Sequence, residues 1–207
     1  MQVIKEEIRR DIVGAAKREF LKRGYQNASM RVIAKRANTS IGNLYHYFPN
    51  KEAILDEVVQ DMPERLVNML NAHKQYEFEN MDTLTEMTPV QLISLIDQFM
   101  PQLFETELLL EDSTIILLEG CEGTKYAYVR EAIISVFKGH LAEHLAGNKN
   151  ELLVNTLIHT VVMALLYIAK NKNDVEQGYD AIQKYLKLII VGMMCDNDFT
   201  MDDRYQK

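Results

Sequence analysis

The sequence has no tryptophan and only two cysteines, four prolines and nine glycines among its 207 residues. Cys121 and Cys195 lie far apart without partners at metal-ligand spacing, which favours buried reduced thiols over a disulfide or a redox sensor. No stretch of alternating β-branched residues occurs, which argues against a β-sheet protein. Apolar residues instead recur at three- and four-residue spacings nearly from end to end, and this pattern predicts an all-α fold.

Signatures of catalysis and export are also missing. The sequence shows no glycine-rich phosphate loop, no serine nucleophile motif and no paired carboxylates in a recognisable setting, so we expect neither an enzyme nor a cofactor. No apolar run flanked by basic residues stands at the N-terminus, so a secretory signal is not predicted and a cytoplasmic location is expected.

The formal net charge of −7 is unevenly distributed. Residues 1–55 hold eleven Lys and Arg against five Asp and Glu, a balance of +6, and residues 56–207 hold twelve against twenty-five, a balance of −13. A basic segment on an acidic chain is the footprint expected of a nucleic-acid-binding domain joined to a body that does not touch nucleic acid.

The helices expected from periodicity and capping residues cover most of the chain. A domain of residues 1–50 is expected to join, through a helix that begins at Lys51, a larger domain of residues 51–207. Pro63 predicts a kink or break in that helix, and Asn38 suits the left-handed turn between the second and third helices. Capping signals stand at Ser29, Ser40 or Thr39, Asn50, Thr88 with Gln91, Asn148 with Glu151, and Asp174 with Gln177. The expected helices are 4–23, 30–36, 40–47, 51 to about 75, 89–104, 106–119, 125–146, 149–171 and 175–194, with a loop at 76–87 and a loose tail after 195.

Residues 29–55 have the pattern of two short helices joined by a tight turn, as in a helix-turn-helix. Gly42 permits close approach of the backbone to DNA, and Asn43 has the donor and acceptor that an adenine edge requires. Ser29, Tyr45, Tyr47 and Lys51 can bind phosphate oxygens.

The run Ser40-x-Gly42-x-x-Tyr45-x-Tyr47-Phe48-x-x-Lys51, preceded by Ser29-x-x-x-Ile33-Ala34-x-x-Ala37, resembles the DNA-binding signature of the TetR family of bacterial transcriptional regulators. The resemblance covers about residues 5–56. It departs from the family at Asn38, where glycine is frequent, at Thr39, where an apolar residue is usual, and at His46, one place before the usual histidine. The resemblance implies that the DNA contacts are Ser29, Arg31, Ser40, Gly42, Asn43, Tyr45, His46, Tyr47 and Lys51.

The last two long helices are expected to form a homodimer interface, in agreement with what the resemblance implies. Leu152 to Ala169 is eighteen residues without a formal charge, so this helix must be buried on several sides. A membrane span is the alternative, but four polar residues lie in one half of the run and no basic or aromatic belt flanks it.

Two further groups of residues invite a functional interpretation. Aromatic and methionine side chains could line a pocket for an apolar or amphipathic effector, although ordinary core packing is the favoured interpretation of any single one of them. These candidates are Phe99, Met100, Phe104, Tyr126, Tyr128, Phe137, Met163 and Tyr167. His140 and His144 stand one helical turn apart, a spacing that can hold zinc, but no third ligand is evident, so no metal is predicted.

The sequence therefore predicts a ligand-responsive repressor that binds a near-palindromic double-stranded DNA operator as a homodimer. The alternative is a helical DNA-binding interaction protein that senses no small molecule. A helical enzyme with a metal at the histidine pair is a weaker third hypothesis.

Overall fold

A computed structural model describes residues 2–85, 88, 90, 91, 93, 94, 97, 106–144 and 151–197, and these contain helices and no strand. The predicted all-helical class is confirmed. The chain divides into two compact units, each described separately below. The head unit is Met1–Leu66 with Glu111–Glu131, and the body unit is Val67–Leu110 with Ala132–Lys207.

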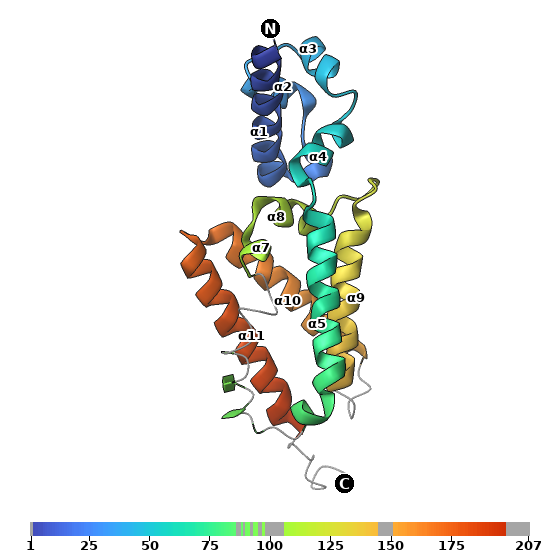
Figure 1. Cartoon of the computed structure of the whole chain (residues 1–207), viewed down its shortest axis with the longest axis vertical. Coiled ribbons are helices and arrows are strands. Elements are labelled where there is room, and N and C mark those ends of the chain that lie inside the picture. The colour runs from blue at the N-terminus through green and yellow to red at the C-terminus, as the bar shows by residue number, and fades with distance from the viewer. Residues whose placement is uncertain are drawn as a thin grey trace. The chain divides into compact units, whose positions relative to one another are not determined.

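The head unit contains the predicted helix-turn-helix. Its helices are α1 (Gln2–Asn27), α2 (Met30–Arg36), α3 (Ile41–Tyr47) and α4 (Lys51–Val59), coloured from blue to cyan in Figure 1. Ile12, Phe20, Ile33, Leu44 and Phe48 are almost completely buried and form its core. Gly24 interrupts α1 with φ 72° and ψ 158°, a backbone region that is essentially restricted to glycine.

A segment distant in sequence completes the head unit. Helix α8 (Asp112–Glu119) packs against α1 and α4, and the buried Ser113 hydroxyl donates a 2.8 Å hydrogen bond to the Val58 carbonyl. Cys121 follows as a buried free thiol whose pKa burial raises to about 12, as expected for a reduced structural cysteine. The head unit thus extends beyond residue 50, and the domain boundary expected at that residue stays a prediction.

The break expected near Pro63 is present, but a different residue makes it. Helix α4 ends at Val59, Gln60 takes a positive φ of 45°, and α5 (Met62–Thr85) begins two residues later. Pro63 lies in the first turn of α5, where its missing N–H has no intrahelical partner to lose.

Two sequence predictions about helix continuity were wrong. The polar stretch from residue 76, expected to be a loop, continues α5 as far as Thr85, because it contains no proline or glycine to end the helix. The helix expected over 106–119 is two helices, α7 (Thr106–Leu110) and α8, because Glu111 adopts an extended conformation with ψ 143°.

The long helices of the body unit lie close to their predicted positions. They are α9 (Ala127–His144), whose first turn belongs to the head unit, α10 (Glu151–Asn171) and α11 (Val175–Asn197). Val154 and Ile158 of α10 are buried among Ile134, Leu157 and Ile189. The Gly147–Asn148 boundary and the tail after residue 197 lie outside the described residues.

A capping box at Thr88 and an N-cap at Asp174 confirm that start signals in the sequence act locally. The Gln91 side-chain oxygen accepts a 2.9 Å hydrogen bond from the Thr88 N–H, and the Thr88 hydroxyl accepts one from the Gln91 N–H at 3.4 Å. The Asp174 carboxylate accepts a 2.8 Å hydrogen bond from the Gln177 N–H at the start of α11. Such capping bonds satisfy backbone donors that a helix leaves unpaired at its first turn.

Candidate nucleic-acid interface

The turn between α2 and α3 is fixed by backbone hydrogen bonds around Asn38. Asn38 has φ 50°, as predicted, and its N–H donates to the Lys35 carbonyl at 3.3 Å. The Thr39 N–H donates to the Ala34 carbonyl at 3.0 Å. These two bonds form a Schellman motif, in which asparagine adopts the left-handed conformation more readily than most residues that carry a side chain.

Helix α3 begins immediately after this turn and is held on its inner side. The Ser40 hydroxyl accepts a 3.0 Å hydrogen bond from the Asn43 N–H and so caps the helix, as predicted. Leu44 and Phe48 are buried, and the Arg9 guanidinium lies 4.8 Å from the centre of the Phe48 ring. Rotation of α3 about its axis would expose both apolar side chains, so its outward face is fixed.

That outward face carries most of the predicted base-reading residues. Ile41, Gly42, Tyr45 and His46 are exposed, and the His46 and Tyr47 rings meet edge to face with centres 5.8 Å apart. Asn43 is half-buried at the edge of the face, where its side-chain Nδ2 donates a 2.7 Å hydrogen bond to the Thr39 hydroxyl. Thr39 was expected only as an alternative cap of this helix, and its hydroxyl instead supports the Asn43 side chain four residues later.

The predicted phosphate ligands of α2 are available at its start. Ser29 occupies the N-cap position, but its side chain makes no capping hydrogen bond, in contrast with the expectation. Arg31 is exposed in the first turn of α2. The positive end of the helix dipole lies at the same place and favours an anion there.

Lys51 requires a correction to its predicted role. Its ammonium group donates to the carbonyls of Tyr25, Gln26 and Ala28 at 2.6, 3.0 and 3.3 Å, and it lies 4.5 Å from the centre of the Tyr25 ring. Burial lowers the pKa of Lys51 and raises the pKa of Tyr25 to about 12. An ammonium group has three N–H donors, and all three have acceptors within the protein, so Lys51 joins the end of α1 to the start of α4.

Replacing Lys51 with methionine is expected to lower the stability of the protein by about 1–2 kcal/mol, because three carbonyls lose a charged donor. The dependence of operator affinity on salt concentration should stay unchanged, because no phosphate contact is lost. Urea unfolding and binding titrations at several salt concentrations measure the two effects. Arg31→Ala is the matched control, for which the salt slope should fall by about one unit. A similar fall for Lys51→Met at unchanged stability would restore Lys51 as a phosphate ligand.

Only some of the predicted pocket residues lie in the part of the chain that the structure describes, and the effector pocket stays a prediction. Met163 and Tyr167 are 48% and 69% exposed on α10. Tyr126 is half-buried in the head unit, and Tyr128 is exposed. Phe99, Met100 and Phe104, together with the side chain of Phe137, lie outside the described residues.

The side chains of His140 and His144 also lie outside the described residues. Among the residues that the structure describes, no group of three or more possible metal ligands occurs. Of the described helices, α10 is long and apolar enough to cross a membrane by length and composition. A single such helix is weak evidence, because the core helix of a protein that never enters a membrane passes the same test.

These features define a helix-turn-helix DNA-binding domain. They are the turn closed by backbone hydrogen bonds, the helix α3 with its fixed outward face, and the basic charge of residues 1–55. The family model of bacterial regulatory proteins of the tetR family matches residues 12–58. The match covers the helix-turn-helix, so residues 12–58 form a DNA-binding domain of the tetR type.

Individual relatives show how far the likeness extends. The transcriptional regulator UidR of Escherichia coli is 37% identical over 65 residues, which are 31% of this chain and 33% of that protein. The transcriptional regulator LuxR of Vibrio harveyi is 20% identical over 180 residues, 83% of each chain. A solved transcriptional regulator of Aquifex aeolicus is 22% identical, covers 88% of this chain and 99% of its own, and gives a TM-score of 0.44. The strongest sequence likeness is thus confined to a third of the relative's length.

Proposed function

We propose that this protein is a ligand-responsive transcriptional repressor of the cytoplasm that binds a near-palindromic DNA operator as a homodimer. The proposal rests on the position of α3. The outward face of this helix is exposed, and the Ser40 cap and the buried Leu44 fix it in place. A short helix held in this way behind a tight turn is the element that enters the major groove in helix-turn-helix proteins. The relatives named above are transcriptional regulators, which supports the same class.

The proposed contacts divide into two groups. Ser40, Gly42, Asn43 and His46 face the bases, with Asn43 suited to adenine. Ser29, Arg31, Tyr45 and Tyr47 bind the phosphates on either side and set the register of α3 in the groove. Lys51 positions the end of α1 beside α4 rather than binding DNA directly.

Dimer formation through the last two helices is supported by apolar side chains that a single chain leaves uncovered. Leu152, Met163 and Tyr167 of α10 are 77%, 48% and 69% exposed, and Leu188 of α11 is 73% exposed. A two-fold interface would bury the same face on both protomers. Two copies of α3 could then occupy successive major grooves roughly 34–36 Å apart on a near-palindromic site.

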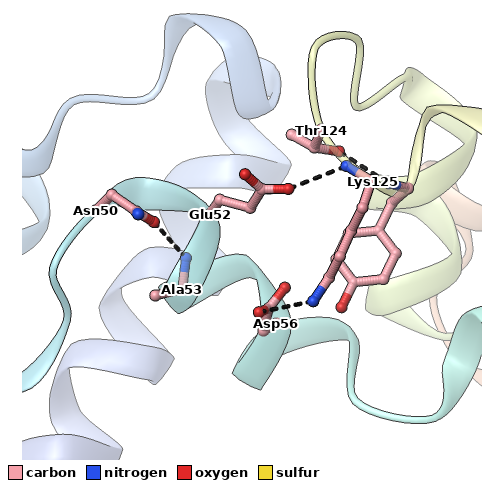
Figure 2. A network of polar contacts seen from close by, with 7 residues as sticks. Asn50, Glu52, Ala53, Asp56, Thr124 and Lys125 are labelled. Carbon is pink, nitrogen blue, oxygen red and sulfur yellow. Dashed lines mark hydrogen bonds and ion pairs between the residues drawn. The ribbon is translucent and has the colours of Figure 1, made fainter.

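The segment between α8 and α9 supports a route by which an effector could act on the DNA-binding helices. Figure 2 shows the Lys125 ammonium beside Asp56 of α4, at 2.9 Å, and the Lys125 N–H donating to the Glu52 carboxylate at 3.0 Å. The hydrogen bond to Asp56 raises the pKa of Lys125. Because α9 continues from this segment into the body unit, an apolar or amphipathic effector bound there could displace α4.

Selection of bound DNA from a random pool tests the proposed function. A near-palindromic sequence should emerge, and light scattering should show two protomers on it. A screen of apolar and amphipathic metabolites for release of this DNA then tests the effector. A protein that binds its operator but responds to none of them would favour the alternative, a DNA-binding interaction protein without small-molecule sensing. Recovery of no preferred sequence would refute the proposal.

Lys125→Met is expected to leave operator affinity unchanged and to shift the effector concentration for half release by about two- to fivefold. The shift is small because a solvent-exposed ion pair contributes little to the balance between two conformations. Fluorescence anisotropy of labelled operator during effector titration measures it. Lys184→Met is the matched control, since Lys184 forms an exposed 2.8 Å pair with Asp180 in α11. If Lys125→Met and Lys184→Met give the same response curve, Lys125 does not transmit the effect of the effector to α4.

A further inference from the structure

We propose that Thr39 positions the side chain of Asn43 for base recognition, and that this turn residue therefore helps to determine the operator sequence. The inference rests on the proposed DNA-binding function and adds to it a specificity residue that faces Asn43 rather than the DNA. It depends on the 2.7 Å hydrogen bond from Asn43 Nδ2 to the Thr39 hydroxyl.

The backbone at both ends of this hydrogen bond is already fixed. The Thr39 N–H is bonded to the Ala34 carbonyl in the Schellman motif, and the Asn43 N–H is bonded to the Ser40 hydroxyl at the helix cap. The side-chain bond closes a ring from Thr39 through Ser40 to Asn43. Because threonine is β-branched, its χ1 rotamers are restricted, and the hydroxyl provides a stiff support for the amide.

The hydrogen bond leaves Asn43 able to read a base. A carboxamide has two N–H donors and one carbonyl acceptor, and Thr39 uses one of the donors. The second N–H and the carbonyl oxygen still form the donor and acceptor pair that matches N7 and N6 of adenine. Asn43 is only half-buried, so part of this residue remains accessible to a ligand.

Positioning before binding has a measurable consequence. A free asparagine side chain must be immobilised when the complex forms. A side chain that is already held in position avoids this cost, which should raise the affinity for DNA about two- to tenfold. The benefit is restricted to the base pair that Asn43 contacts. Loss of the Thr39 hydroxyl should therefore change affinity and base preference together, at one position of the operator.

Thr39→Val removes the hydroxyl and keeps the shape of the side chain, and Thr39→Ser keeps the hydroxyl as the matched control. On the operator selected by the natural protein, Thr39→Val should bind two- to tenfold more weakly and lose base preference at the same base pair as Asn43→Ala. Thr39→Ser should keep this preference. In the double variant Thr39→Val with Asn43→Ala, the loss should not exceed that of Asn43→Ala alone.

A second measurement needs no DNA. In NMR spectra of the free protein, the side-chain amide protons of Asn43 should exchange with solvent faster in Thr39→Val than in the natural protein and in Thr39→Ser. Unchanged exchange would overturn the inference. Independent, additive losses of affinity would overturn it as well, since Thr39 would then act separately, for example on a phosphate.

The two proposals fail in different ways. If the natural protein selects no operator, both the proposed function and this inference are refuted. If it selects an operator whose recognition by Asn43 does not depend on the Thr39 hydroxyl, only the inference falls.

Discussion

Gly42→Ala should weaken binding to the operator by about tenfold or more while leaving the protein as stable as before or slightly more stable. Gly42 is exposed on α3, and an added Cβ would meet only the Ser40 hydroxyl oxygen, at 4.0 Å. Alanine is favoured over glycine within a helix by about 0.5–1 kcal/mol. Because nothing in the fold requires glycine here, a loss of binding would indicate that DNA approaches the backbone of α3 closely at this residue. Such a loss, at about 1–3 kcal/mol, is comparable with that of a mismatched base pair.

Urea unfolding and anisotropy titrations with labelled operator separate the two effects. Gly14→Ala is the matched control, since Gly14 also lies within a helix, α1, where an added Cβ would meet only Arg18 at 3.7 Å. This control should gain a similar increment of stability and bind the operator normally. If Gly42→Ala binds as tightly as the natural protein, the face of α3 at Gly42 is not the one that contacts DNA.

Arg36→Met should lower the free energy of unfolding by about 1–3 kcal/mol, the largest stability effect that we expect from a charged residue of the head unit. Glu19 of α1 is 3% exposed, and its carboxylate accepts a 2.6 Å hydrogen bond from the Arg36 guanidinium of α2. Removal of one partner leaves a buried charge without its counter-ion, which costs several kcal/mol in a fully buried pair. Arg36 is about one third exposed, so we expect less than that full cost.

The stability of Arg36→Met is measured by chemical unfolding, with Lys35→Met as the control. Lys35 is exposed and adjacent on α2, and its replacement should change stability by less than about 0.5 kcal/mol. The double variant Glu19→Met with Arg36→Met should recover much of the loss, because two apolar side chains can replace a buried ion pair. Equal, small effects of Arg36→Met and Lys35→Met would show that water, not Arg36, stabilises the Glu19 carboxylate.

Features that depend on a few neighbouring residues could be predicted from the sequence. Ser40, Asn50 and Asp174 cap helices where expected, since a capping hydrogen bond joins residues only three positions apart. The left-handed turn at Asn38 was predicted for the same reason. The helical class also followed from periodicity, because burial of one face requires apolar residues at regular spacing along the chain.

Other features could not be predicted, because residues far apart in sequence determine them. Lys51 was expected to bind phosphate, but the carbonyls of residues 25, 26 and 28 surround its ammonium group. Met163 and Tyr167 fit a buried helix by composition, yet packing turned the opposite side of α10 inward. The break at Glu111 has no proline or glycine to mark it, and it separates α7 of the body unit from α8 of the head unit.

The sequence by itself therefore determined that the chain is helical, where most helices begin, and that residues 29–55 form a helix-turn-helix of the TetR type. Periodicity, capping and turn chemistry act over one or two helical turns, so the order of residues is sufficient to specify them. Only the tertiary structure decided which donors remain available to DNA and which apolar residues stay exposed. A side chain's partners depend on what the fold brings beside it, as the Tyr25 carbonyl beside Lys51 and the Glu19 carboxylate beside Arg36 show.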